Sequence, residues 1–116
     1  MRNTEMEKSK IHILIELIEY LPNSVVSKTI IRKTTGNVSV IAMDTGEALA
    51  ENISPFDTFI QIIDGSAEVV INEKSNMLKT GEGIIIPAHT SNRVKANERF
   101  KMISSIIKSG YEAHNL

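Results

Sequence analysis

The sequence predicts an all-β fold, either a sandwich or a barrel. From Val25 onward, β-branched residues dominate a series of short apolar runs, as is typical of strands. Groups of Gly, Asn, Asp, Ser and Thr, which tolerate turn geometry, separate these runs about every ten residues. This pattern favours many short antiparallel strands over alternating strands and helices.

Residues 11–23 are expected to form a short helix or arm before the barrel. Leu14, Leu17, Ile18 and Leu21 recur at the spacing of one helix face, and Pro22 ends the segment. Residues 1–10 are polar and charged, so we expect them to be frayed, and residues 110–116 are expected to form a C-terminal tail. The barrel is predicted to span residues 24–109.

Nine strands are predicted within this span. They cover residues 25–32, 38–43, 48–53, 58–63, 67–72, 77–79, 83–86, 92–95 and 100–108. We expect Gly65 and Gly81 to lie where strands reverse, because glycine adopts the positive φ of tight turns. Pro87 follows an isoleucine run and is expected to end that strand.

The charge balance and the absence of cysteine limit the classes of partner. Thirteen basic and fourteen acidic residues give a formal charge of −1, which argues against nucleic-acid binding or polybasic membrane attachment. The lack of cysteine excludes disulfides, thiolate metal sites and cysteine nucleophiles, and it suits a reducing compartment. The first ten residues lack the apolar core of a signal peptide. We therefore expect a cytoplasmic protein whose partners are small molecules or a second copy of itself.

Two glycine-anchored segments carry a resemblance to a known family. The first runs from Gly46 to Gly65, and in the second Gly81 is followed after five residues by Pro87. With this combined spacing the chain resembles a small single-domain cupin of the cupin type-2 conserved barrel family. The resemblance implies a double-stranded β-helix, or jelly-roll barrel, here with a short N-terminal helix.

The same resemblance implies which positions line the barrel's central site. Metal-binding cupins place three His and one Glu there, and the matching positions of this chain hold four uncharged side chains. We name these positions the polar quartet: Asn52, Ser54, Thr58 and Asn92. Transition metals prefer imidazole or thiolate, and harder ions need carboxylate charge. The resemblance therefore implies a degenerate metal site, and we expect a barrel without metal or other cofactor.

The polar quartet admits two interpretations. Its amides and hydroxyls supply donors and acceptors that could orient a small polar ligand. Alternatively, the four side chains satisfy one another and trapped water. Phe56 and Phe59 flank the first segment, and core packing is their expected role.

His89 is the titratable group nearest the second segment, where the family pattern has a glycine in a tight turn. It could act in the pocket as a general acid or base, or replace a missing metal ligand. The simpler interpretation is an exposed loop histidine. His12 and His114 are expected at the surface.

Three functions from different classes remain open. The favoured one is a small-molecule-binding barrel of undetermined role. Under this interpretation we expect no enzymatic activity, although the sequence does not exclude it. The alternatives are a metal-independent isomerase, epimerase or cyclase that uses His89, and a divergent metal-dependent cupin enzyme.

A homodimer is expected from the exposed sheet edges of a small barrel and from an N-terminal segment, residues 11–31, that is rich in Ile, Leu and Val. The resemblance implies a dimer in which such arms lie against the partner barrel.

Overall fold

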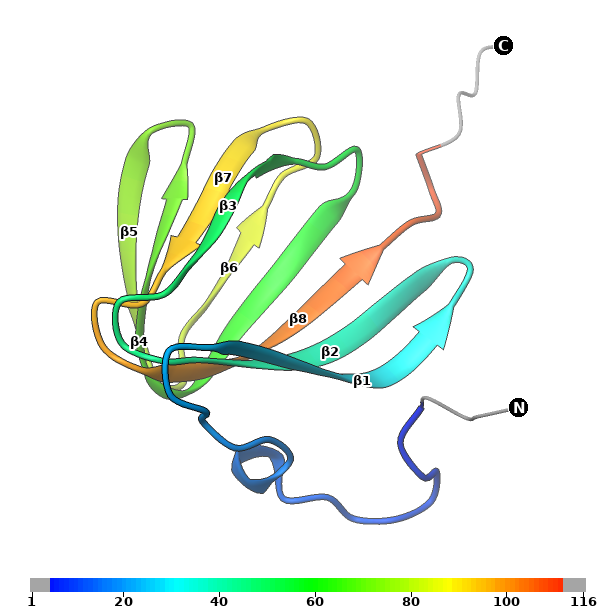
Figure 1. Cartoon of the computed structure of the whole chain (residues 1–116). Coiled ribbons are helices and arrows are strands. Elements are labelled where there is room, and N and C mark those ends of the chain that lie inside the picture. Colours follow the sequence, from blue (N-terminus) through cyan, green and yellow to red (C-terminus); the bar gives the residue numbers. More distant parts are fainter. Residues whose placement is uncertain (1–4, 112–116) are drawn as a thin grey trace, which may run out of the picture.

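The computed structural model describes residues 5–111, which form a curled, antiparallel, nearly all-β structure (Figure 1). One short helical turn, η1, precedes eight strands. The elements are η1 (Leu14–Glu16), β1 (Val25–Lys33), β2 (Gly36–Met43), β3 (Ala48–Ile53), β4 (Asp57–Ile71), β5 (Lys74–Lys79), β6 (Gly83–Ile86), β7 (Ser91–Lys95) and β8 (Phe100–Ile107). The predicted all-β class is confirmed.

The strands form two sheets that share β4. The first sheet has the order β1, β2, β8, β4, β6, and the second has the order β3, β7, β4, β5. Residues 57–65 of β4 pair within the first sheet, and residues 66–71 pair within the second. Because one strand crosses from sheet to sheet, the two sheets face each other across a common interior.

The predicted strand reversals at Gly65 and Gly81 are both wrong. The sequence indicated two strands, residues 58–63 and 67–72, whereas β4 continues through Gly65 and bends there with φ +79°. The returning chain, β5 and β6, bends opposite this point at Gly81, with φ +92°. Gly81 N donates to Ile62 O at 2.8 Å, and the Thr80 hydroxyl donates to Gly65 O at 2.9 Å. The positive φ values thus allow both strands of the hairpin to bend together from one sheet to the other. A glycine in the sequence indicates a positive φ, but it does not show whether the chain bends or reverses there.

The main core fills the space between the sheets. Phe100, Met43 and Ile62 are among its largest fully buried side chains. They come from β8, β2 and β4, whose inward residues alternate with outward ones as strand geometry requires. This core occupies one end of the interior and leaves a cavity toward the other.

The predicted N-terminal helix is reduced to the single 3-10 turn η1. Its first residue is preceded by Ile13, which provides no side-chain cap, and the β-branched Ile11, Ile13 and Ile15 are poor helix formers. A segment this short forms a stable helix only with tertiary support. No helix within residues 5–111 has the length and apolar character needed to cross a bilayer.

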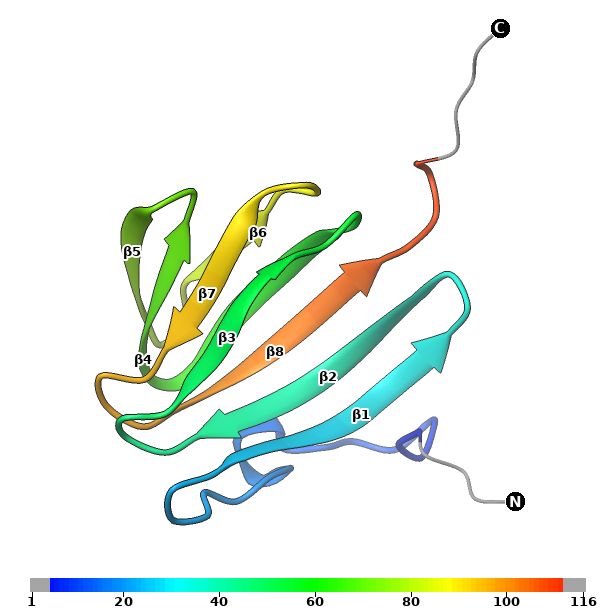
Figure 2. The same cartoon turned by 45° about the horizontal axis from the view of Figure 1, so that its top comes forward.

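The arm that contains η1 packs on the outer face of the first sheet, as Figures 1 and 2 both show. Ile18 is buried against Val40, Ala42 and Ile103, whose side chains point away from the main core. Leu14 and Leu21, which share the predicted helix face with Ile18, are exposed. The arm is therefore attached through part of its apolar surface only.

A polar cluster joins this arm to the sheet. Lys101, which is buried, donates from Nζ to Ile15 O at 2.6 Å and lies 4.9 Å from the centre of the Tyr20 ring. The Tyr20 hydroxyl donates to the Asp64 carboxylate at 2.6 Å. The pKa of Tyr20 is raised above its usual value, mainly by burial and secondly by this hydrogen bond. Buried polar groups that bond in this way fix the position of the arm.

Residues 5–10 lie beside β1. Met6 N donates to Ile30 O at 2.9 Å, Arg32 N donates to the Glu5 carboxylate at 2.8 Å, and Lys33 pairs with the same carboxylate at 3.0 Å. Residues 1–4 and 112–116 lie outside the described residues, so the frayed start and the C-terminal tail stay predictions.

Candidate ligand pocket

All four side chains of the polar quartet line one cavity between the sheets. This cavity has a volume of about 200 Å³. Its remaining walls are mainly apolar and include Ile60, Ile86, Met102 and Ile106. The positions that the resemblance assigned to the central site are therefore brought together by the fold.

Strand pairing explains this convergence. Asn52 on β3 is the direct cross-strand partner of Asn92 on β7, so both amides lie on the inner face of the second sheet. Thr58 on β4 pairs with Ile106 on β8 in the first sheet. Ser54 follows β3, and its position is fixed because its carbonyl accepts the backbone N–H of His89 at 2.7 Å.

Ser104 is a fifth polar residue of this cavity, and the sequence interpretation missed it. Its side chain comes from the inner face of β8 and is 9% exposed. Ser104 pairs with Ile60, the residue two positions after Thr58, so the Ser104 and Thr58 hydroxyls are diagonal neighbours on one sheet face. The available signal was alternation: within the apolar run 100–107, Ser104 shares the inward parity of Phe100 and Met102.

The cavity has a mouth and a floor. Asn52 is exposed at one side, whereas Ser104 and Met102 are buried at the other. A ligand would therefore enter past the amides of the second sheet and reach the hydroxyls of the first.

Several polar groups of this cavity are not used by the protein. Asn92 Nδ2 donates to the backbone carbonyls of Asn52 and Thr90, at 3.1 and 3.4 Å, and the Ser54 hydroxyl accepts Phe56 N at 3.1 Å. Within residues 5–111, by contrast, the side chains of Asn52, Thr58 and Ser104 make no hydrogen bond. No fully buried polar side-chain atom in that part of the chain lacks a bond, so these groups face open space. Asn92 and Ser54 thus bond to backbone groups and not to other side chains of the quartet, and satisfaction of the quartet by trapped water stays a prediction.

The donor set does not fit the metals that cupins bind. Of the described residues that line the cavity, none is His, Cys, Asp or Glu. Nor do residues 5–111 contain any group of three such side chains placed to hold an ion. Uncharged amides and hydroxyls alone leave a divalent ion without counter-charge in a largely apolar cavity.

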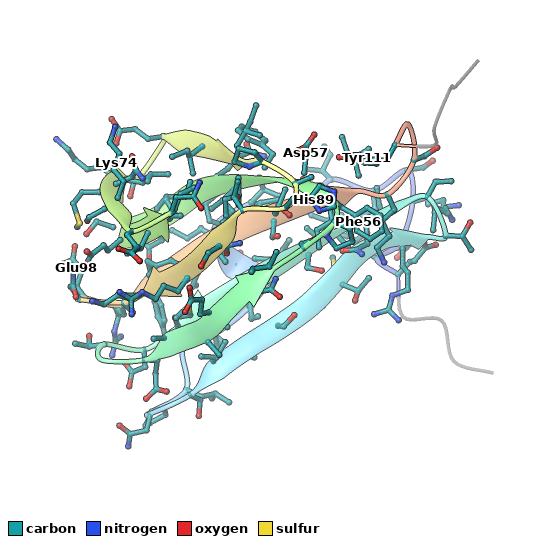
Figure 3. The ribbon with its side chains drawn as sticks, turned by 90° about the horizontal axis from the view of Figure 1, so that it is seen from above. Phe56, Asp57, Lys74, His89, Glu98 and Tyr111 are labelled. Carbon is teal, nitrogen blue, oxygen red and sulfur yellow. The ribbon has the colours of Figure 1, made fainter. Side chains whose placement is uncertain are left out.

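His89 does not join the polar quartet at the cavity wall. Its side chain is exposed in the loop after β6, and its φ of +64° matches the glycine conformation of the family pattern. Figure 3 shows His89 at the same end of the barrel as Phe56, Asp57 and Tyr111. There the Asp57 carboxylate accepts Ala88 N at 2.7 Å and the Phe56 and Tyr111 rings lie 5.8 Å apart. Contacts at this end fix the loop without bringing the imidazole to the cavity.

The remaining sequence candidates also lie elsewhere. Phe59, expected in the core, points to the outer face of the first sheet and is 40% exposed. His12 bonds to Glu7 O at 3.0 Å, away from the cavity, and His114 lies outside the described residues. A second hollow, of about 340 Å³, shares Asn92 with the cavity. The Glu51 carboxylate in its lining accepts a hydrogen bond from the Ser91 hydroxyl.

Comparisons with known proteins agree with this architecture. No protein-family model matches the chain, and no curated protein matches its sequence. Solved structures do match. A conserved protein of unknown function from Streptococcus pyogenes is 25% identical, with a TM-score of 0.86 over 96% of this chain and 95% of that one.

Two further neighbours are cupins by name. A cupin superfamily protein from Desulfitobacterium hafniense is 23% identical, with a TM-score of 0.83 over 92% of this chain and 98% of that one. A cupin 2 conserved barrel domain protein from Leptotrichia buccalis is 28% identical, with a TM-score of 0.79 over 82% of this chain and 46% of that one. The shared architecture confirms the predicted jelly-roll barrel. The chain therefore has the fold of a small cupin barrel.

Proposed function

We propose that the chain is a small-molecule-binding cupin barrel whose central cavity holds an organic guest without a metal. The observation that supports this most directly is the set of unused polar groups on Asn52, Thr58 and Ser104 inside one mainly apolar cavity. Apolar walls with a few convergent polar groups are the usual composition of a ligand site. The walls would supply affinity, and the polar groups would supply orientation.

The lining gives no support to a catalytic alternative. An isomerase, epimerase or cyclase needs a group that moves a proton at the substrate, and His89, the candidate for that role, is exposed outside the cavity. A divergent metal enzyme needs charged or imidazole ligands, which the described lining lacks. Binding without chemistry is the function that this cavity supports best.

Adjacent serines on β8 provide a matched experiment. Ser104 faces the cavity, whereas Ser105 lies on the outer face of the same strand. Ser104→Val replaces the hydroxyl in the cavity by a methyl group and adds a second methyl group, and Ser105→Val makes the same chemical change outside. Thermal unfolding of the wild type against a panel of metabolites should reveal stabilising compounds, because a ligand that binds only the folded state raises its stability.

The expected result is stabilisation that Ser104→Val abolishes and Ser105→Val retains. If no compound stabilises the wild type, or if both variants respond as the wild type does, the cavity is not the binding site.

A homodimer is the second part of the proposal. On the outer face of the first sheet, Phe59, Ile85 and Ile107 surround an apolar groove and are 40%, 62% and 58% exposed. The chain also presents an apolar segment of its own, in which Ile11 is 93% exposed. A second copy would bury both surfaces by twofold symmetry, since each copy supplies a groove and an arm.

Scattering mass in dilute solution tests this assembly. The wild type should have twice the mass of the chain, and Ile85→Glu should give the monomer, whereas Gln61→Glu, also on the outer side of this sheet, should leave the dimer intact. A monomeric wild type at micromolar concentration would contradict the proposed homodimer.

We also propose that the protein is cytoplasmic, since the absence of cysteine suits a reducing compartment.

A further inference from the structure

The chemistry of the cavity limits the class of molecule that it can bind. We propose that the guest is a neutral, ring-sized carboxamide or lactam. This inference rests on the proposed binding function and adds the charge, the size and the polar edge of the molecule.

The charge follows from the lining. Every described residue that lines the cavity is uncharged, whether apolar or polar. A carboxylate or phosphate in the cavity would lose its hydration and meet no opposite charge, which is strongly unfavourable. A cation would meet the same difficulty. The cavity therefore selects molecules that are uncharged at neutral pH.

The size follows from the volume of about 200 Å³. An engineered apolar cavity of about 150 Å³ holds a benzene molecule. The space here accommodates one such ring with a single small substituent. Apolar contact on the ring faces would come from side chains such as Ile60 and Met102, which contribute to the cavity walls.

The polar edge follows from the amide pair at the mouth. Asn92 Nδ2 is held by two backbone carbonyls, so its Oδ1 is left as an acceptor. Asn52 beside it keeps a free donor and a free acceptor, since its side chain makes no hydrogen bond within residues 5–111. Two neighbouring amides with this pattern complement a ligand edge that donates and accepts at adjacent atoms. Carboxamides and lactams have such an edge.

The hydroxyls on the inner face of the first sheet complete the arrangement. Thr58 and Ser104 lie on the opposite sheet from the amides, so the guest would have polar contacts at two ends and apolar contacts between them. A hydroxyl both donates and accepts, and so it tolerates a carbonyl, an ether or a ring nitrogen at that end. Specificity would therefore be strict at the mouth and broad at the floor.

Benzamide and benzoate are a suitable pair of probes, because they have the same shape and differ in charge and in donor capacity. Their dissociation constants would be measured by titration calorimetry at pH 7 on the wild type, Asn52→Leu and Ser105→Val. Benzamide should bind the wild type roughly tenfold or more tightly than benzoate, since the site offers the anion no partner. Asn52→Leu should weaken benzamide binding at least roughly fivefold through loss of the amide contact, and Ser105→Val should leave it unchanged.

Each other result has a definite meaning. Benzoate binding that equals or exceeds benzamide binding overturns the inference, as does benzamide binding that is insensitive to Asn52→Leu. If neither probe binds while other compounds bind in a manner that Ser104→Val abolishes, the carboxamide assignment is wrong and the binding function stands. If no compound of any class binds, the binding function itself fails.

Discussion

Gly65 and Gly81 lie opposite each other where the central hairpin crosses between the sheets. A position can require glycine for its backbone conformation or for its lack of a side chain, and these two residues allow the two requirements to be measured separately. Both have positive φ, +79° and +92°, which is unfavourable for alanine. Only Gly65 is also crowded. A Cβ atom there would lie 2.3 Å from Arg99 O and 3.1 Å from Phe100 Cα, whereas a Cβ atom on Gly81 would meet nothing within 4 Å.

The magnitudes follow from this difference. Alanine in the left-handed region costs about 1–2 kcal/mol, and its lower entropy in the unfolded chain returns about 0.4–1 kcal/mol. Gly81→Ala should therefore destabilise the fold by about 1 kcal/mol. In Gly65→Ala, Arg99 O is backbone and must move, and it adjoins Phe100, which is fully buried. Displacing a packed core in this way adds about 1–3 kcal/mol, so the total should be about 2–4 kcal/mol.

Urea unfolding at one fixed protein concentration measures both variants against the wild type, and a fixed concentration excludes any effect of association. The free energy of unfolding of Gly65→Ala should fall about 2 kcal/mol below that of Gly81→Ala, which corresponds to a midpoint about 8 °C lower in a thermal scan. Equal losses in the two variants would refute the assignment of Gly65 to a crowded crossover. So would a Gly65→Ala variant as stable as the wild type.

Three further predictions concern titration and the cavity. The raised pKa of Tyr20 means that its contribution to stability is complete below pH 10 and is lost as the pH rises further, so the free energy of unfolding of Tyr20→Phe should lie below the wild-type value at pH 7 and approach it above pH 10. The pKa of Asp44 is lowered chiefly by a hydrogen bond from Asn23 N, so Asp44→Asn should destabilise the protein at pH 7, and urea titrations should show a smaller effect at pH 3. Finally, replacing the polar quartet by the residues of the metal-binding pattern should create calorimetric affinity for nickel, manganese or zinc, and a folded variant without it would contradict the assigned positions. That variant is Asn52→His, Ser54→His, Thr58→Glu and Asn92→His.

The spacing of apolar runs and turns was sufficient to predict the class of fold, and the resemblance to the cupin pattern implied the polar quartet. Gly46, Gly65, Gly81 and Pro87 fix where the chain bends or stops, and alternation then fixes which side chains face inward. Ser104 obeys the same alternation, but it is not one of the four positions that the cupin pattern names.

Other features depend on contacts between distant residues, which no local pattern contains. Residues 14–21 have the apolar spacing of a helix face, but they do not form a helix beyond one turn. The arm is instead held by Lys101 of β8, which donates to Ile15 O. Once the arm is attached in this way, one turn of helix is enough to bury Ile18. The bend at Gly65 is a second case, since its neighbour Arg99 is also remote in sequence.

The two kinds of position in the cupin pattern have separate physical roles, and this separation explains how a barrel can change its chemistry. Gly65, Gly81 and Pro87 determine the backbone path, and none of them lines the cavity. The polar quartet lines the cavity, but among residues 5–111 only its Asn92 and Ser54 side chains bond to the backbone. Substitution at Asn52 or Thr58 therefore changes what the cavity can hold without removing a bond on which the barrel depends. Likeness of fold follows from the first kind of position, whereas the ligand must be inferred from the second.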